Sequence, residues 1–507
     1  MNDTGDGAER RMHPWSWLFV LAQQVRPFVV PLLALLFFGA RVNDGDLWAY
    51  AAPVIAVAAL VLASAWQCLS FRYRIGADRI TVRSGLLHRN LREIPFARIH
   101  NVTIHQNLLH RLFGVAELRL ESAGGRKPEA EMRVLALHDA LALEARVRHH
   151  AGMPLADASA IDAATATPPA RGGRVLLAMP TAEVVRLGLV SNRGMLVVAA
   201  GFGALWQIVP DRLLPRLLES WTRQALGYAD GLHGRMAALA LAAALALLLA
   251  WAALRLLSVT LALTQYHGFT LSEAGSRLQV ERGLLGRIRT SVACRRIQAW
   301  TLREGVLHRM FGRRSLDIDT AVVEQHEDGP RWLDELAPLA TPAACDALVR
   351  HLLPAIAWPP DTWQPAPSAA AWRLMLPDLL LTPLAAAALA WHLGPWGLLA
   401  LAWLPWSAWL AFKAIARMGY TRDERRVAVR GGGWSRWWRF AELDKLQALQ
   451  LRRSPLDRVC GTATLWLDTA GADAAVPPLR IRFLPAAEAE ALRDRLAAML
   501  ARRRLRW

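Results

Sequence analysis

The stretch that decides the fold is residues 98–114, RIHNVTIHQNLLHRLFG, because the chain contains it three times. A shift of 198 residues reaches residues 296–312 (RIQAWTLREGVLHRMFG), and a shift of 347 reaches residues 445–461 (KLQALQLRRSPLDRVCG), with no gap. Each copy lies among short alternating apolar segments that end at Gly, Asp or Asn, a pattern typical of strands and turns. A segment with helical spacing follows each copy. The sequence therefore predicts three copies of one unit, in which several antiparallel strands are closed by a C-terminal helix.

The segments between the copies are strongly apolar. Of the 507 residues, 54% are hydrophobic, and residues 47–69 run without a charge for the length of a membrane span. Further apolar runs occur in pairs, so we expect α-helical membrane hairpins alternating with α+β soluble domains. The predicted segments are an interfacial helix with hairpin 1 (14–69), domain 1 (71–151), a linker (152–174), hairpin 2 (181–258), domain 2 (266–353), a linker (354–370), hairpin 3 (372–416) and domain 3 (420–502).

The charge balance bears on partners and sidedness. Sixty basic against 42 acidic residues give a net charge of +18, which is typical of contact with nucleic acid or an anionic membrane, or of the positive-inside bias. Two spans separate successive units, so all three units are expected on one side. Basic residues flank the spans on that side, which predicts a multi-pass inner (plasma) membrane protein with cytoplasmic domains; they are Arg72, Arg74, Arg255, Lys413, Arg417 and Arg422. The four cysteines form no CxxC pair, which fits reduced thiols.

Alignment of the three copies separates shared residues from private ones. The shared glycines predict turns that need positive φ; they are Gly85, Gly283 and Gly432, and Gly114, Gly312 and Gly461. A shared arginine (Arg111, Arg309, Arg458) just before the second glycine favours a structural pairing or a carbonyl cap. A second shared arginine follows the first glycine: Arg89, Arg287 and Arg436. We hypothesise that it contacts anionic lipid headgroups or an acidic partner segment, and the alternative is a solvated strand end or an internal salt bridge.

The third copy departs from the others after its turn glycine. Residues 431–439, GGGWSRWWR, interleave Trp434, Trp437 and Trp438 with Arg436 and Arg439. This composition favours the membrane interface, where indole rings lie at headgroup level. Packing against a neighbouring domain is the main alternative. Nucleic acid would also use such residues, but a domain tethered beside membrane spans has the bilayer as its nearer partner, so no nucleic acid is expected.

Catalytic patterns are sparse. The sequence contains no GxSxG, HExxH, Walker A or dinucleotide-binding motif. His100, His105 and His110 recur every five residues, which matches no metal-ligand spacing. Asp317 and Asp319 form a DxD pair that could hold a metal with a nucleotide sugar, without a second carboxylate cluster beside it. We therefore expect no enzyme activity, no cofactor and no metal.

The repeated signature resembles a known family. Residues 98–102 (RIHNV) and 109–114 (LHRLFG), the turn glycine and the flanking span pairs resemble the bacterial membrane-flanked domain proteins, whose soluble units are the second type of bacterial PH-like domain. The resemblance weakens in the third copy, where Cys460 takes the Phe position. It implies three PH-like antiparallel split barrels, each with a C-terminal helix, and a binding rather than a catalytic role. It does not carry over inositide binding.

These expectations combine into a function and an alternative. The first is a non-enzymatic membrane protein whose PH-like domains bind a protein partner, a second copy of the chain or the anionic leaflet, with the resemblance implying envelope-stress or antimicrobial-peptide protection. The alternative is a transporter or lipid-handling protein gated by these domains. Few ionisable residues lie in the spans, Asp378 being the exception, which weakens the alternative.

Overall fold

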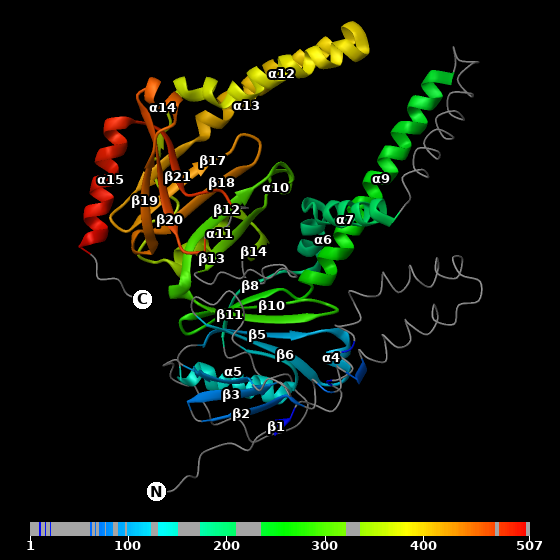
Figure 1. Ribbon diagram of the computed structural model, residues 1–507, viewed down its shortest axis with the longest axis vertical. Helices are drawn as coiled ribbons and strands as arrows, with labels where there is room; N and C mark the ends of the chain where they lie inside the picture. Colours follow the sequence, from blue (N-terminus) through cyan, green and yellow to red (C-terminus); the bar gives the residue numbers. More distant parts are fainter. Residues whose placement is uncertain are drawn as a thin grey trace.

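The computed structural model describes much of the chain, and the fold below is that of the described residues (Figure 1). They are residues 10–11, 16, 21, 61–62, 66, 70–76, 78–84, 90–96, 99–122, 130–150, 173–208, 235–320, 335–471 and 476–502. The described residues leave out most of the predicted hairpin 1 and most of the linker 152–174. They also leave out residues 209–234 and the candidate contact Arg89.

The first unit consists of six main strands and a C-terminal helix, as the repeat pattern predicts. Alternation sets its strands, because Ile80 and Val82 of one strand face the core while Arg79 and Arg83, on either side of them in the sequence, face solvent. Its core lies between the strands and the helix, whose buried residues include Leu143 and Val147. The elements are β2 (Arg72–Ile75), β3 (Arg79–Ser84), β4 (Asn90–Pro95), β5 (Ile99–Gln106), α4 (Leu108–Leu112), β6 (Val115–Ser122), β7 (Ala130–Ala136) and α5 (Leu137–His150), with the two-residue β1 (Arg10–Arg11) paired to β2.

The second and third units repeat this order. In the second, the elements are β9 (Thr270–Ala274), β10 (Arg277–Arg282), β11 (Arg287–Ala293), β12 (Ile297–Glu304), α10 (Val306–Met310), β13 (Arg314–Thr320), β14 (Glu335–Ala340) and α11 (Pro342–Leu352). In the third, they are β16 (Gly419–Arg422), β17 (Arg426–Gly431), β18 (Arg436–Glu442), β19 (Leu446–Arg452), α14 (Pro455–Val459), β20 (Thr462–Thr469), β21 (Arg480–Pro485) and α15 (Ala486–Ala501). Strands β8 (Arg174–Ala178) and β15 (Gln364–Pro365) add to the outer edges of β9 and β16.

The units are joined to one another through their sheets. One seven-stranded sheet has the order β7-β6-β5-β11-β10-β9-β8, so the last strands of the first unit continue into the first strands of the second. A second seven-stranded sheet, β14-β13-β12-β18-β17-β16-β15, joins the second unit to the third in the same way. The shared pairs are β5 with β11 and β12 with β18, both antiparallel. Within the described residues, two further sheets remain at the ends, β1-β2-β3-β4 and β19-β20-β21.

The two junctions use one register. At the first, Gln106 lies opposite Arg287 and Val102 opposite Ser291. At the second, Glu304 lies opposite Arg436 and Trp300 opposite Phe440. These residues occupy the same positions of the repeat, so each of the five residue pairs of the first junction has its counterpart in the second. Neighbouring copies of the repeat therefore pair through the same strands in the same register.

The shared sheet of the second junction separates two cores. On one face, Trp300 and Leu302 of β12 and Phe440 of β18 belong to the core of the second unit. On the other face, Ala299 of β12 and Ala441 of β18 belong to the core of the third. Apolar burial on both faces stabilises the sheet much more than one face would.

Three apolar helices among the described residues are candidate membrane spans. They are α9 (Arg235–Tyr266), α12 (Ala371–Leu393) and α13 (Trp403–Arg417), the last preceded by the 3-10 segment η6 (Gly394–Ala402). In the described part of the chain, three stretches are long and apolar enough to cross a membrane: Ala243–Tyr266, Ser368–His392 and Gly394–Arg417. Of the six predicted spans, the two of hairpin 1 lie outside the described residues.

The first part of the predicted hairpin 2 (181–258) is a bent helix pair. Helix α6 (Thr181–Val190) and helix α7 (Arg193–Ile208) meet at 54°, and they count as a fourth candidate span only if taken together. Val184 and Leu187 of α6 pack into the core of the second unit. Part of the segment predicted as hairpin 2 (181–258) thus belongs to the second unit.

Candidate functional site

The candidate site is the end of each junction that lies beside the membrane helices. It consists of two loops, residues 283–286 between β10 and β11 and residues 432–435 between β17 and β18, with the short helices α4 and α10 beside them. We call this set the rim. Figure 1 shows α4 and α10 on the side toward which α9 and α12 project, and α5 and α15 on the opposite side.

Hydrogen bonds to the loop backbone fix the rim loops to the membrane helices. Leu284 N–H donates to the Thr264 carbonyl at the end of α9, at 3.0 Å. In the third unit, Arg417 Nη1 at the end of α13 donates to the Gly433 carbonyl at 2.7 Å. Both loops therefore lie at the point where a span enters its unit.

Glycines allow both loops to turn. Gly283 has φ +114° and Gly432 has φ +97°, and a Cβ on either would lie 1.8 Å from the carbonyl oxygen three residues later. The positive φ predicted for these shared positions is confirmed. The glycines of the second shared set also have φ near +60°: Gly114, Gly312 and Gly461.

The shared arginine of the repeat holds neighbouring units together at the rim. Arg111 Nη1 donates to the Leu284 carbonyl at 2.9 Å, and Arg309 Nη2 donates to the Trp434 carbonyl at 2.9 Å. The prediction of a carbonyl cap is confirmed at both positions, and the carbonyl belongs to the next unit. The third member, Arg458, is exposed at the end of the array.

Apolar side chains are exposed along the rim. Leu112 is 76% exposed, Met310 74% and Trp434 52%. Large exposed apolar side chains that gather in one place mark an interaction surface with protein or membrane. The other exposed members are Leu108 and Leu109 on α4, Leu284 and Leu285 on the first loop, and Phe311 after α10.

Trp434 continues into a tryptophan cluster on the last span. Its ring packs edge to face against Trp406 of α13 with centroids 5.9 Å apart, and Trp406 stacks on Trp409 at 4.9 Å. Lys413 Nζ lies 4.1 Å from the centre of the Trp409 ring. Indole rings beside a basic residue at a span end are typical of a membrane–water interface.

The other predicted contact residues divide into two groups. Arg287, the first residue of β11, is exposed. Arg436, the first residue of β18, is partly exposed and lies 3.9 Å from the carboxylate of Glu304 across the junction. The structure thus brings Arg436 into the internal ion pair that was its alternative, and keeps Arg287 on the surface.

Trp437, Trp438 and Arg439 lie in strand β18, between two packed faces. Trp437 packs against the core of the third unit and Trp438 against that of the second. Arg439 is 1% exposed; its Nη1 donates to Thr301 Oγ1 at 2.9 Å and its Nη2 to Asp319 Oδ2. Burial lowers the pKa of the Arg439 guanidinium, and the Asp319 carboxylate opposes this effect. Arg439 is thus buried inside the junction, whereas Trp437 and Trp438 are partly exposed beside it.

Each carboxylate of the DxD pair forms an ion pair with an arginine. Asp317 Oδ2 lies 3.1 Å from Arg303 Nε, and Asp319 is paired with Arg439. Cationic side chains thus stand where a metal would have to bind. Across the described residues, no group of three His, Cys, Asp or Glu side chains is arranged to hold a metal.

Burial raises the pKa of the Cys345 thiol to about 12, so this thiol is inert at neutral pH.

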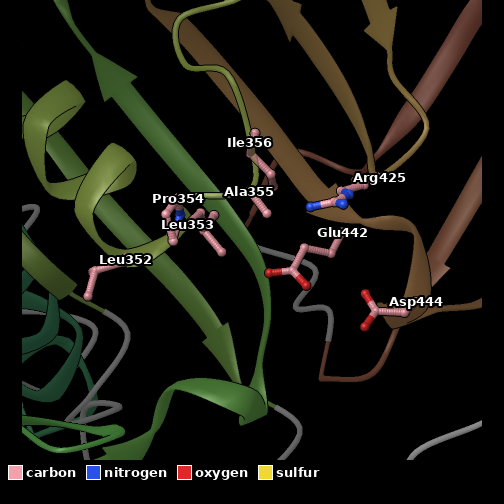
Figure 2. A pocket seen from close by; sticks show the side chains of 8 residues that line it. All are labelled: Leu352, Leu353, Pro354, Ala355, Ile356, Arg425, Glu442 and Asp444. Carbon is pink, nitrogen blue, oxygen red and sulfur yellow. The ribbon is translucent and has the colours of Figure 1, made fainter.

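A small pocket lies between the second and third units. Figure 2 shows the guanidinium of Arg425 and the carboxylates of Glu442 and Asp444 beside the apolar chain that follows α11. The cavity measures about 310 Å³, and its lining contains no histidine and no nucleophile. Its lining residues are Leu352, Leu353, Pro354, Ala355, Ile356, Arg425, Glu442 and Asp444.

Two polar clusters that the sequence did not predict fasten the membrane helices to the units. In the third unit, Arg373 Nη2 of α12 donates to Asp457 Oδ1 at 2.6 Å, with both side chains less than a tenth exposed. Burial would raise the pKa of Asp457, but hydrogen bonds from Arg373, Ser454 and Thr462 lower it well below its usual range. In the second unit, Arg193 Nη2 of α7 lies 2.6 Å from Glu335 Oε1 on β14.

The comparisons with known proteins agree with this architecture. The profile of the bacterial PH domain matches residues 25–151, 224–340 and 372–500. The transmembrane protein YdbT of Bacillus subtilis (strain 168) is 22% identical over 427 residues, which cover 83% of this chain and 84% of that protein. No solved structure gives a significant match. The chain is a membrane protein that belongs to the bacterial PH domain family, and it carries three copies of that domain.

Proposed function

We propose that the protein is a non-enzymatic scaffold of the inner membrane, which holds a row of three cytoplasmic PH-like units against the anionic leaflet through the rim. The observation that carries the proposal is the row of exposed apolar side chains, Leu112, Met310 and Trp434 among them, on loops and short helices fastened to the span ends. Because the rim lies at the ends of the spans, these side chains meet the lipid headgroups and the upper part of the acyl chains.

The charge of the chain supports the same orientation. A net charge of +18 attracts the protein to an anionic surface, and each basic side chain near such a leaflet contributes about 1 kcal/mol. Arg287 is exposed next to the first rim loop, and Lys413 lies at the cytoplasmic end of the last span in this orientation. Protection against membrane-active peptides would follow if the array covers the leaflet, and sensitivity of a deletion strain to such peptides would measure it.

The two alternatives receive less support. An enzyme that used the DxD pair would have to displace the arginines from Asp317 and Asp319. A transporter would use ionisable groups within its spans. Asp378 of α12 instead accepts hydrogen bonds from Trp403 and Ser407 of the neighbouring helical segment, a structural use of this carboxylate.

The depth of the rim in a bilayer tests the proposal. The full chain with Cys68→Ser, Cys294→Ser and Cys460→Ser, carrying a nitroxide label at either Met310→Cys or Trp434→Cys, would be reconstituted in phosphatidylcholine vesicles with and without phosphatidylglycerol. We expect collision with oxygen to exceed collision with a water-soluble nickel chelate at both sites, and the difference to grow with phosphatidylglycerol. A label on Asp494→Cys, on the exposed face of α15, is the matched control. Equal, water-like accessibility at all three sites would contradict the proposal.

A further inference from the structure

The two ends of the array carry complementary strand edges. Strand β4 holds the repeat position of β11 and β18, and strand β19 that of β5 and β12. Inside the chain these two kinds of strand pair twice, in one register. Within the described residues, β4 pairs with β3 and β19 with β20, and each forms the outer edge of its sheet. Figure 1 shows the first sheet and β19 at opposite ends of the soluble part, so one chain does not bring them together.

We propose that β19 of one chain pairs with β4 of a second copy, and that the protein assembles head to tail through the junction it already uses twice internally. This proposal goes beyond the proposed contact with lipid, because it names the partner of the array ends. A contact between two different surfaces is heterologous, so it produces a ring if the rotation closes and an open chain if it does not.

Side chains of β19 are more exposed than the side chains at the same repeat positions of β12, which has a partner strand in the next unit. Ala299 and Leu302 of β12 are fully buried, each at 0%. Of their counterparts in β19, Ala448 is exposed and Leu451 is half-buried. On the other side, Leu91 of β4 is 63% exposed. An edge strand that presents apolar side chains and unpaired backbone groups favours the addition of another strand.

The side chains at the ends match in the register of the internal junctions. Carried to the ends, that register places Leu451 opposite Leu91, Gln450 opposite Arg92 and Arg452 opposite Asn90. Opposed leucines form a favourable cross-strand pair. Pro95, which could not donate a ladder hydrogen bond, lies beyond the five paired positions.

The charged pair of the second junction would also be reproduced. There, Arg439 contacts Thr301 on the facing strand and Asp319 on the strand behind it. The repeat positions of these three residues at the chain ends are Arg92, Gln450 and Asp468. Arg92 and Asp468 are both exposed in the single chain. The arginine and the aspartate that pair at the second junction therefore have exposed counterparts at opposite ends of the array.

Disulfide trapping of the full chain in membranes tests this pairing. Facing residues of an antiparallel pair have Cα atoms about 4.5–5.5 Å apart, within reach of a disulfide. In a background with Cys68→Ser, Cys294→Ser and Cys460→Ser, Leu91→Cys with Leu451→Cys should give a ladder of dimers and larger species on mild oxidation. The matched control is Leu91→Cys with Arg452→Cys, whose side chain points to the other face of the strand, and it should crosslink far less.

A charge exchange gives a second, independent readout. Arg92→Asp should abolish the ladder, and addition of Asp468→Arg should restore it. Coexpression of a chain carrying only Leu91→Cys with one carrying only Leu451→Cys should stop at the dimer. Monomers under all conditions, equal crosslinking in the control pair, or adducts with a different protein would overturn the proposal. Each of these outcomes leaves the lipid-depth experiment unaffected, so the two proposals can fail separately.

Discussion

Arg439 and Asp319 are 120 residues apart in the chain, yet they form a buried ion pair at the centre of the second junction. The arginine side chain is 2% exposed and the aspartate side chain 7%. Charges buried to this degree are tolerated only when each satisfies the other. Thr301 completes the arrangement by accepting a hydrogen bond from the same guanidinium. This pair explains why Arg439 serves the junction between units, although its neighbours in the sequence favoured a lipid contact.

Removal of the arginine should therefore loosen the third unit. Arg439→Met removes the guanidinium that pairs with the buried Asp319 carboxylate, and the loss of one member of a buried pair costs about 3–5 kcal/mol. We expect a lower midpoint of thermal unfolding in detergent and faster proteolysis of the third unit. Arg493→Met breaks only the exposed pair with Asp494 and should change stability by about 0–1 kcal/mol. Equal effects of the two variants would refute the structural role of Arg439.

At the scale of the element, strand β18 shows what sequence reasoning reached and what it missed. The turn at Gly432 was predictable, because the shared glycine indicates positive φ. Residues 436–439, RWWR, were interpreted as part of a contact segment, but they belong to strand β18, which packs on both faces. A continuous run of large residues after a turn is the signal for a strand buried on both sides, and it could have been recognised. The partner strand could not, because periodicity assigns side chains to faces and says nothing about which edge pairs with which.

The turn that starts β18 should be intolerant of a side chain. Gly432→Ala would place a Cβ 1.8 Å from the Ser435 carbonyl at φ +97°, so the loop must rearrange. We expect a destabilisation of more than about 1 kcal/mol and a weaker contact between the loop and α13. Gly201→Ala, on an exposed face of α7 with no atom within 4 Å of the added Cβ, should be neutral or slightly stabilising. Thermal unfolding of the two variants in one detergent compares them, and a tolerated Gly432→Ala would contradict the turn geometry.

At the scale of the whole molecule, the three units form one continuous row. Their existence, their order and the long apolar helices were predictable from the threefold repeat and from hydropathy. Their connection was not, since the repeat specifies one unit and the junction arises between two. The bent pair α6 and α7 was also missed. Val184 and Leu187 of α6 are buried in the core of the second unit. Apolar residues that face a protein core look the same in the sequence as apolar residues that face lipid.

Hydrogen exchange of the full chain in lipid vesicles, followed by mass spectrometry, tests the joined sheets most directly. Strands β11 and β18 lie inside seven-stranded sheets, with a neighbour on each side. Their amides should exchange as slowly as those of β10 and β17, because both edges of each strand are paired. Arg439→Met should accelerate exchange in β18 and leave β11 unchanged. If β11 and β18 instead exchange rapidly in the unsubstituted chain, as unpaired edge strands do, the three units are separate domains and the continuous row is wrong.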